Sequence, residues 1–190
     1  AALERKFWRE REKELVDKLH IQATTDQLTG IFNRRVIFEA LDDAMENSKK
    51  SQDRQFATIM FDIDFFKQVN DNYGHSGGDA VLISFAQLLQ AEISSPNIVG
   101  RIGGEEFLAI LYLSPDEALE FCKKLIKKIN TNVVSYEGTD IKISSSGGVA
   151  FSTETETSAD LTNKADERLY EAKKDGRNRF KLIDNELVGD

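Results

Sequence analysis

Two short acidic segments that lie far apart in the sequence could together bind a metal ion. Asp62 and Asp64 end a β-rich run at residues 56–64, and Glu105 and Glu106 follow a pair of glycines between two apolar stretches. Carboxylates that pack together repel one another, so such a cluster needs a cation, and oxygen ligands without His or Cys suit Mg²⁺ or Mn²⁺. Either pair alone is better explained as solvated acids at a strand end. Together, on neighbouring strands, the two pairs favour a metal site.

The segment after the first acidic pair could bind a phosphorylated ligand. Residues 64–79 (DFFKQVNDNYGHSGGD) form a polar, glycine-containing connection into a helix. Backbone N–H groups of such a loop can hold phosphate oxygens, and Lys67 adds a positive charge. Asn70 and Asp79 could read guanine, whose N1–H and exocyclic amine donate to a carboxylate and whose O6 and N7 accept from an amide. A helix cap is the alternative for Asn70. His75 could contact phosphate or base, and a cap or a packed turn residue is its alternative.

Two basic residues far along the chain could face the same ligand. Lys173 lies at the end of a predicted helix, and Arg177 follows the glycine that ends it. Both side chains could reach the phosphates of a bound nucleotide. Basic residues in the last turn of a helix commonly interact with the helix dipole, so this pair taken alone carries little weight.

Hydrophobic periodicity predicts the elements that must position these residues. Ser114 suits a helix N-cap, and Gly176 suits a helix C-terminal cap. Apolar residues at helical spacing predict helices over residues 34–50, 77–94, 114–133 and 158–178. Short β-rich runs predict strands over residues 56–64, 97–102, 106–112, 141–152 and 179–183. Gly103 and Gly104 suit a two-residue hairpin turn with positive φ between the second and third strands.

The order of these elements predicts the fold class. After two leading helices the order is β-α-β-β-α-β-α-β, which belongs to the α+β class. Its centre matches a ferredoxin-like unit, an antiparallel central sheet flanked by helices that lie mainly on one face. On this topology the end of the first strand and the turn between the second and third lie at one edge of the sheet. The four carboxylates would meet there.

The first 24 residues are rich in Glu, Lys and Arg and contain no Gly or Pro, so we expect a helix. Trp8, Leu15 and Leu19 lie near a heptad seam, but too few repeats are present to establish a coiled coil. A stalk from an upstream module and a solvated helix docked on the domain are both compatible with this pattern. We expect residues 1–24 to be a stalk or linker, residues 25–184 the catalytic domain, and residues 185–190 a C-terminal tail.

Composition limits the partners and the compartment. The 190 residues carry a formal net charge of −8, which argues against a nucleic-acid partner because such binding needs a broad basic surface. Cys122 is the one cysteine, so a reducing, cytoplasmic setting is expected. The sequence contains no apolar run long enough to span a membrane. This does not exclude a membrane anchor elsewhere in a longer protein.

The same motifs carry a resemblance to a known family. GGEEF, the segment FDIDFFKQVNDNYGHSGGD, DQLTGIFNRR at residues 26–35 and ADERLYEAKKDGRN together resemble the GGDEF family of diguanylate cyclases, in a GGEEF variant. The resemblance covers Asp26 to about Phe180. It implies a nucleotidyl-cyclase-type fold and the condensation of two GTP into cyclic di-GMP with release of pyrophosphate, in bacterial second-messenger signalling. It also implies a homodimer with one GTP and two Mg²⁺ or Mn²⁺ ions in each half-site, downstream of a sensory or regulatory domain.

The resemblance assigns roles to individual residues. The metal ligands would be Asp62, Glu105 and the backbone carbonyl of Ile63, with Glu105 and Glu106 as the catalytic acids. Asn70 and Asp79 would read guanine. The phosphate contacts would be the backbone N–H groups of Phe65 and Phe66 and the side chains of Lys67, Lys173 and Arg177.

One position departs from the family pattern. Many members carry an Arg-x-x-Asp pair before the signature that binds the product and inhibits the enzyme, and here Ser94 and Asn97 occupy these positions. Neither side chain can make the bidentate contact of a guanidinium group. We therefore predict that product inhibition through this site is absent.

Three other functions remain possible from the sequence. A nucleotide polymerase palm and a class III cyclase use carboxylates on a related sheet; the acidic net charge disfavours the polymerase, and a product assay separates the cyclases. A degenerate domain that binds GTP as a sensor, or that serves only as a partner surface, is the non-enzymatic alternative. The complete set of acidic and nucleotide-binding motifs favours catalysis, because a binding-only site need not keep its metal ligands.

Overall fold

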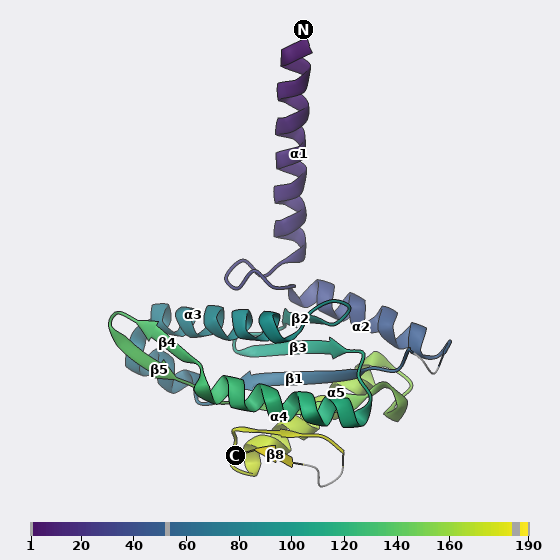
Figure 1. Ribbon diagram of the computed structural model, residues 1–190, viewed down its shortest axis with the longest axis vertical. Helices are drawn as coiled ribbons and strands as arrows, with labels where there is room; N and C mark the ends of the chain where they lie inside the picture. Colours follow the sequence, from purple (N-terminus) through teal and green to yellow (C-terminus); the bar gives the residue numbers. More distant parts are fainter. Residues whose placement is uncertain (1, 52–53, 184–186, 190) are drawn as a thin grey trace.

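A mixed β-sheet forms the centre of the protein in the computed structural model, which describes residues 2–51, 54–183 and 187–189 (Figure 1). Within this part of the chain the main sheet has six strands in the order β2-β3-β1-β6-β7-β8. The strands are β1 (Ala57–Ile63), β2 (Ile98–Arg101), β3 (Glu106–Leu111), β6 (Ser145–Phe151), β7 (Arg179–Lys181) and β8 (Leu187–Gly189). Neighbouring strands are antiparallel except β6 and β7, which are joined through a helix and run parallel. The predicted α+β class is confirmed, with one parallel pair in the sheet.

Helices cover both faces of this sheet, so the expectation of helices mainly on one face was wrong. Helices α3 (Phe66–Glu92) and α4 (Pro115–Thr131) pack on the face that carries Phe61. Helices α2 (Arg34–Ser48) and α5 (Ser158–Lys174) pack on the face that carries Met60 and Leu108. Every residue of β1 is buried, and a strand that is apolar on both sides needs cover on both. Two separate hydrophobic clusters result, one on each face.

The predicted strand over residues 141–152 is two strands. Residues 139–142 belong to a separate hairpin of β4 (Val133–Tyr136) and β5 (Thr139–Lys142), and β6 begins only at Ser145. Glu137 and Gly138 connect the hairpin, both with positive φ (47° and 77°), as a two-residue turn of this kind requires. The periodicity of the sequence continued through the break, because Ile141, Ile143 and Ser145 are all buried.

The C-terminal segment expected to be a tail contains the edge strand β8. Residues 187–189 pair antiparallel with β7 at residues 179–181. Residues 184–186 and 190 lie outside the described part of the chain.

The turn between β2 and β3 differs from the predicted two-residue hairpin. It comprises residues 102–105, which we call the signature turn, and the glycines with positive φ in the described chain do not include Gly103 or Gly104. Gly103 is needed for space. A Cβ atom there would lie 2.5 Å from Oε2 of Glu106, so the missing side chain lets this carboxylate fold over the turn.

Helix α1 (Ala2–Thr24) projects away from the sheet and its covering helices (Figure 1). Residues 3–23 are exposed, including Trp8, Leu15 and Leu19. The helix is therefore not docked on the domain, and its role as a stalk stays a prediction. Asn33 Nδ2 and Arg35 Nη2 donate to the carbonyl of Ala23 at 2.9 and 2.7 Å, which fixes the end of α1 to the start of α2.

The helix caps read from the sequence are confirmed. Ser114 caps α4, with its side chain accepting from the N–H of Glu117 while the Glu117 carboxylate accepts from the N–H of Ser114. Gly176 follows α5 with a φ of 117°, and Arg177 N–H donates to the carbonyl of Ala172. No helix in the described residues is both long enough and apolar enough to cross a bilayer.

Candidate active site

The carboxylates of Asp62 and Glu105 meet at one end of the central strands. Asp62 is the last residue but one of β1 and pairs in register with Glu106, the first residue of β3. The backbone N–H of Ile63 donates to the carbonyl of Glu105 at 3.3 Å, which holds the signature turn against the end of β1. Glu105 itself lies in the turn, one residue before β3, which begins at Glu106 as predicted.

Both carboxyl groups of this pair are partly buried, and their pKa values are raised as a result. Burial raises the pKa of Asp62, against the opposing effect of Lys173, whose Nζ lies 2.8 Å from Asp62 Oδ2. Burial also raises the pKa of Glu105, and the negative charge of Asp62 raises it further. A cation bound between the two would relieve both effects, because it favours the charged form of each acid.

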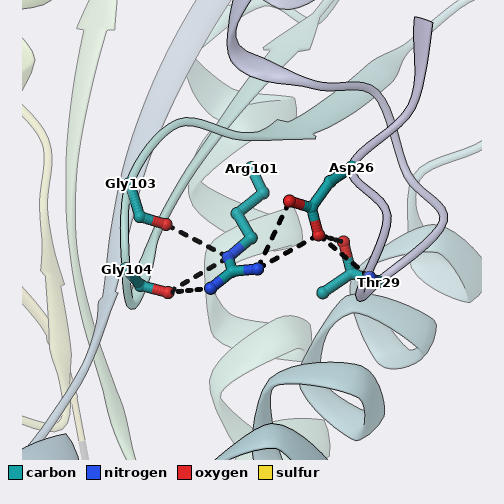
Figure 2. A network of polar contacts seen from close by, with 5 residues as sticks. All are labelled: Asp26, Thr29, Arg101, Gly103 and Gly104. Atoms are coloured by element: carbon teal, nitrogen blue, oxygen red, sulfur yellow. Dashed lines mark hydrogen bonds and ion pairs between the residues drawn. The ribbon is translucent and has the colours of Figure 1, made fainter. Parts of the chain in front are cut away.

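Arg101, the last residue of β2, fixes the shape of the signature turn (Figure 2). Its Nε donates to the carbonyls of Gly103 and Gly104, each at 3.1 Å, and its Nη2 donates to Gly104 at 2.7 Å. Its Nη1 reaches Asp26 Oδ1 at 3.1 Å, and Asp26 also accepts from the N–H and hydroxyl of Thr29. The turn that presents Glu105 is therefore tied to the loop that follows the stalk helix.

The sequence analysis did not identify Arg101 or Asp26 as residues of the site. Asp26 lies inside a quoted motif and Arg101 lies two residues before another, but nothing local pairs two residues that are separated by 75 positions. Arg34 was missed for the same reason: its Nη1 donates to the carbonyl of Ile102 at 2.7 Å and holds the turn from a second side. Covariation between these positions in related sequences is the signal that could find them.

The start of α3 presents the predicted phosphate contacts. Phe65 precedes the helix in the left-handed region (φ 56°), and its side chain does not cap the helix. Its carbonyl accepts from the N–H groups of Gln68 and Val69, whereas the first N–H groups of a helix have no partner within it. The side chain of Phe66 is buried in the core, so only its backbone can contact a ligand. Lys67 is exposed in the same turn. On the other side, Arg177 places its guanidinium 4.7 Å from the centroid of the Phe65 ring.

The predicted guanine-reading residues lie on α3. The helix begins at Phe66 instead of residue 77, and Gly74 (φ 71°, ψ 173°) interrupts it. After this kink, Gly78 lies close to the side chain of Asn70. A Cβ atom on Gly78 would lie only 2.0 Å from Asn70 Oδ1. The side chain of Asn70 is therefore packed against Gly78, the residue before Asp79, whose side chain is exposed. The exposed His75 follows the kink, and its predicted contact stays a prediction.

Comparison with known proteins decides the family. The family described as "Diguanylate cyclase, GGDEF domain" matches residues 23–179. The chain belongs to the GGDEF family. This confirms the resemblance carried by the four motifs.

Individual relatives of this GGDEF domain agree. The chain is 34% identical over 170 residues to Diguanylate cyclase DgcS of Shewanella oneidensis, covering 90% of this chain and 56% of the relative. It is similar to the coiled coil and GGDEF domain of DgcB from Caulobacter crescentus, solved with c-di-GMP (TM-score 0.86, 26% identity, 96% and 97% covered). It is also similar to the active GGEEF domain of a diguanylate cyclase from Vibrio cholerae (TM-score 0.72, 30% identity, 81% and 98% covered). The chain spans little more than half the length of the Shewanella relative.

The donors at the GGDEF carboxylates fit a hard divalent cation. Asp62, Glu105 and the Ile63 carbonyl supply only oxygen, the ligand type that Mg²⁺ and Mn²⁺ prefer. Both acids are partly buried and lie close enough for the charge of Asp62 to raise the pKa of Glu105, an arrangement that a cation would stabilise. The described residues contain no group of three or more His, Cys, Asp or Glu side chains arranged to hold a metal ion.

Asp64 does not belong to the open carboxylate cluster, which corrects the grouping made from the sequence. It is 4% exposed, and both of its oxygens accept hydrogen bonds from neutral groups of the GGDEF domain. The donors are the hydroxyls of Ser144 and Ser146 and the backbone N–H of Asn178. The two acids at the end of β1 thus have different environments. Asp62 forms an ion pair with Lys173, whereas Asp64 is buried and accepts hydrogen bonds from neutral donors.

Ser94 and Asn97, which stand where many family members carry the Arg-x-x-Asp pair, make hydrogen bonds within the domain. Asn97 Oδ1 accepts from the backbone N–H of Tyr112 at 2.8 Å, and the carbonyl of Ser94 accepts from the N–H of Asn97. The absence of product inhibition through this site stays a prediction.

Proposed function

We propose that this GGDEF domain condenses two GTP molecules into cyclic di-GMP. In each half-reaction the 3′-oxygen of one GTP forms a bond to the α-phosphorus of the other, and the bond from that phosphorus to the pyrophosphate leaving group breaks. Two such reactions close the ring and release two pyrophosphates. The observation that carries the proposal is the meeting of Asp62 and Glu105, two dehydrated carboxylates from distant segments, next to Lys173.

The residues of the site have distinct proposed roles. Asp62, Glu105 and the Ile63 carbonyl would hold Mg²⁺ or Mn²⁺, two ions in each GTP-bound half-site, which would neutralise phosphate charge and lower the pKa of the attacking hydroxyl. Glu105 is the proposed acceptor of the proton that leaves the attacking hydroxyl. Glu106, opposite Asp62 in the sheet, adds negative charge beside it.

The remaining residues bind and orient GTP. Lys173 and Arg177 approach from α5 and the turn after it, where cations can balance the triphosphate. The N–H groups of Phe65 and Phe66 and the side chain of Lys67 contact phosphate oxygens at the start of α3. The amide of Asn70 and the carboxylate of Asp79 read the guanine edge, with His75 as a further contact to base or phosphate.

Catalysis requires two copies of the domain, because each holds only one of the two reacting nucleotides. The exposed apolar residues of α1, including Trp8, Leu15 and Leu19, are suited to pair two stalks into a homodimer. An upstream sensory or regulatory domain would then control the distance between the two half-sites. The proposed setting is the cytoplasm, either free or tethered to a membrane through another part of a longer protein.

The test is an assay of product. The protein is incubated with GTP and Mg²⁺, with ATP in parallel, and nucleotides are separated by chromatography and identified by mass spectrometry. Cyclic di-GMP is expected from GTP only, at a rate that rises more steeply than linearly with protein concentration at low concentration. Glu105→Gln, of similar size and neutral, should abolish turnover without unfolding the domain.

Other products decide between the alternatives. A cyclic mononucleotide would indicate a class III cyclase. GTP binding without any product, in a dimeric preparation, would indicate a sensor domain. Either result would contradict the proposed reaction, and so would Glu105→Gln activity close to that of the parent protein.

A further inference from the structure

Asp64 connects three segments of the chain at the proposed phosphate site. Its Oδ2 accepts from Ser144 Oγ at 2.8 Å and from the backbone N–H of Asn178 at 2.9 Å, and its Oδ1 accepts from Ser146 Oγ at 2.7 Å. Its own N–H donates to the carbonyl of Ser144 at 2.9 Å. One buried carboxylate therefore joins the end of β1, the start of β6 and the turn that follows α5. Hydrogen bonds to a charged acceptor are stronger than those between neutral groups.

The segments that Asp64 joins are held in unfavourable backbone conformations. Phe65 follows it directly with a φ of 56°, and Arg177 and Asn178 have φ values of 63° and 51°. The left-handed region costs a residue with a side chain about 1 kcal/mol or more, so these residues need strong local contacts to stay there. The hydrogen bond from Asn178 N–H to Asp64 is such a contact, and it lies beside Arg177 in the chain.

The strained conformations also place Phe65 and Arg177 against each other. The guanidinium of Arg177 lies over the Phe65 ring at 4.7 Å from its centroid, a cation–π contact between the two sides of the site. A residue at 53% exposure such as Phe65 gains little from packing, so its ring serves as a platform for the cation. Rotation of either backbone segment would separate the pair.

We propose that Asp64 is a positioning residue for triphosphate binding: by accepting from Asn178 N–H it sets Arg177 and the Phe65 backbone where the phosphates of GTP are bound. The proposal rests on the proposed function, since it takes these two residues as phosphate contacts. Asp64 touches neither substrate nor metal in this scheme. Its effect is on the phosphates, and the guanine end of the site, at Asn70 and Asp79, does not depend on it.

The test compares a triphosphate with a nucleoside. The probes are a GTP analogue with a methylene bridge between the α- and β-phosphates, which cannot release pyrophosphate, and guanosine, both titrated in Mg²⁺ by calorimetry or NMR. Asp64→Ala should weaken binding of the analogue about tenfold or more, because displacement of binding groups by about 1 Å has effects of that size or larger. The affinity for guanosine should change less than about twofold.

Two matched variants separate positioning from stability. In Asp64→Asn the amide oxygen can still accept from Asn178 N–H while the amide nitrogen donates to the Ser146 hydroxyl, so affinity for the analogue should return to within about threefold of the parent. Ser146→Ala removes one donor to Asp64 but leaves the contact with Asn178, and it should lower the unfolding temperature without changing the affinity. Equal losses for analogue and guanosine in Asp64→Ala, or an unchanged affinity for the analogue, would overturn the proposal.

A measurement on the parent protein needs no variant and covers the case in which Asp64→Ala does not fold. The Asn178 amide should exchange its hydrogen slowly, and the analogue should slow it further while guanosine does not. Exchange at the rate of a free amide would refute the role of Asp64. The proposed function fails separately, if the parent protein binds neither probe or makes no cyclic di-GMP.

Discussion

Gly78→Ala offers a direct test of guanine reading, because the change acts on Asn70 without replacing it. A Cβ atom at residue 78 would lie 2.0 Å from Asn70 Oδ1 and 3.1 Å from its Cγ. Ordinary contact begins at 3.4 Å, so the amide must move by about 1.4 Å. A hydrogen bond with donor and acceptor near 3 Å does not survive a shift of that size.

The expected cost follows from the hydrogen bond that is lost. One net hydrogen bond contributes about 0.5–1.5 kcal/mol, and 1.4 kcal/mol corresponds to a factor of ten. We therefore expect kcat/KM for GTP to fall about tenfold, and the preference for GTP over other nucleotides to fall by a similar factor. The fold should not suffer, because Ala is favoured over Gly inside a helix by up to about 1 kcal/mol and the next contact, Phe66 Cζ at 3.2 Å, needs only a small adjustment.

The assay is steady-state production of cyclic dinucleotide, with thermal unfolding as the control for stability. Asn70→Ala supplies the matched background: there the added methyl group has no amide to displace, so Gly78→Ala should cost little more. An equal loss of kcat/KM in both backgrounds would show that the methyl group acts elsewhere. Unchanged activity and nucleotide preference in the Gly78→Ala single variant would refute the assignment of Asn70 to guanine.

Three further predictions concern the scaffold that carries the site. Gly148→Ala should destabilise the domain by about 3 kcal/mol in denaturant unfolding, because the new Cβ would lie 1.9 Å from the carbonyl oxygen of Ala165 and force α5, with its Lys173, away from β6. Burial raises the pKa of Glu154, but the Arg168 guanidinium, the backbone N–H of Phe151 and the charge of Lys164 together lower it by more, so the net shift is downward. The ionised Glu154 carboxylate therefore stabilises the folded state fully above the ordinary glutamate pKa of about 4.3. This stabilisation is lost as the pH falls through the lower pKa that Glu154 has in the folded state. Glu154→Gln should cost about 2 kcal/mol at neutral pH and progressively less in acid, measured by urea unfolding at several pH values; a pH-independent difference would contradict the ion pair. Ser114→Ala should cost about 1 kcal/mol through loss of the α4 cap, and a change below the error of the measurement would show that the capping box contributes nothing.

Local sequence signals predicted the elements well where the physical cause was local. The cap at Ser114 needs only Glu117 three residues later, and the end of α5 at Gly176 needs only a residue that tolerates a φ of 117°. The break between β5 and β6 had no such signal, because buried residues continue through it. The cover on both faces of the sheet was readable in principle from β1, whose run of apolar residues is typical of a strand buried on both sides.

The sequence by itself determined which groups are available: the acids at Asp62 and Glu105, the glycines beside them, and a charged helix at the N-terminus. Spacing alone could not tell Asp62 from Asp64, since both lie at the end of the same strand, two residues apart and on the same side. Only the tertiary structure decided that Lys173 faces the first while Ser144, Ser146 and Asn178 enclose the second. The physical reason is that the state of a carboxylate depends on the charges and donors around it. Here these come from the start of β6, from α5 and from the turn after α5, 80 or more residues further along the chain.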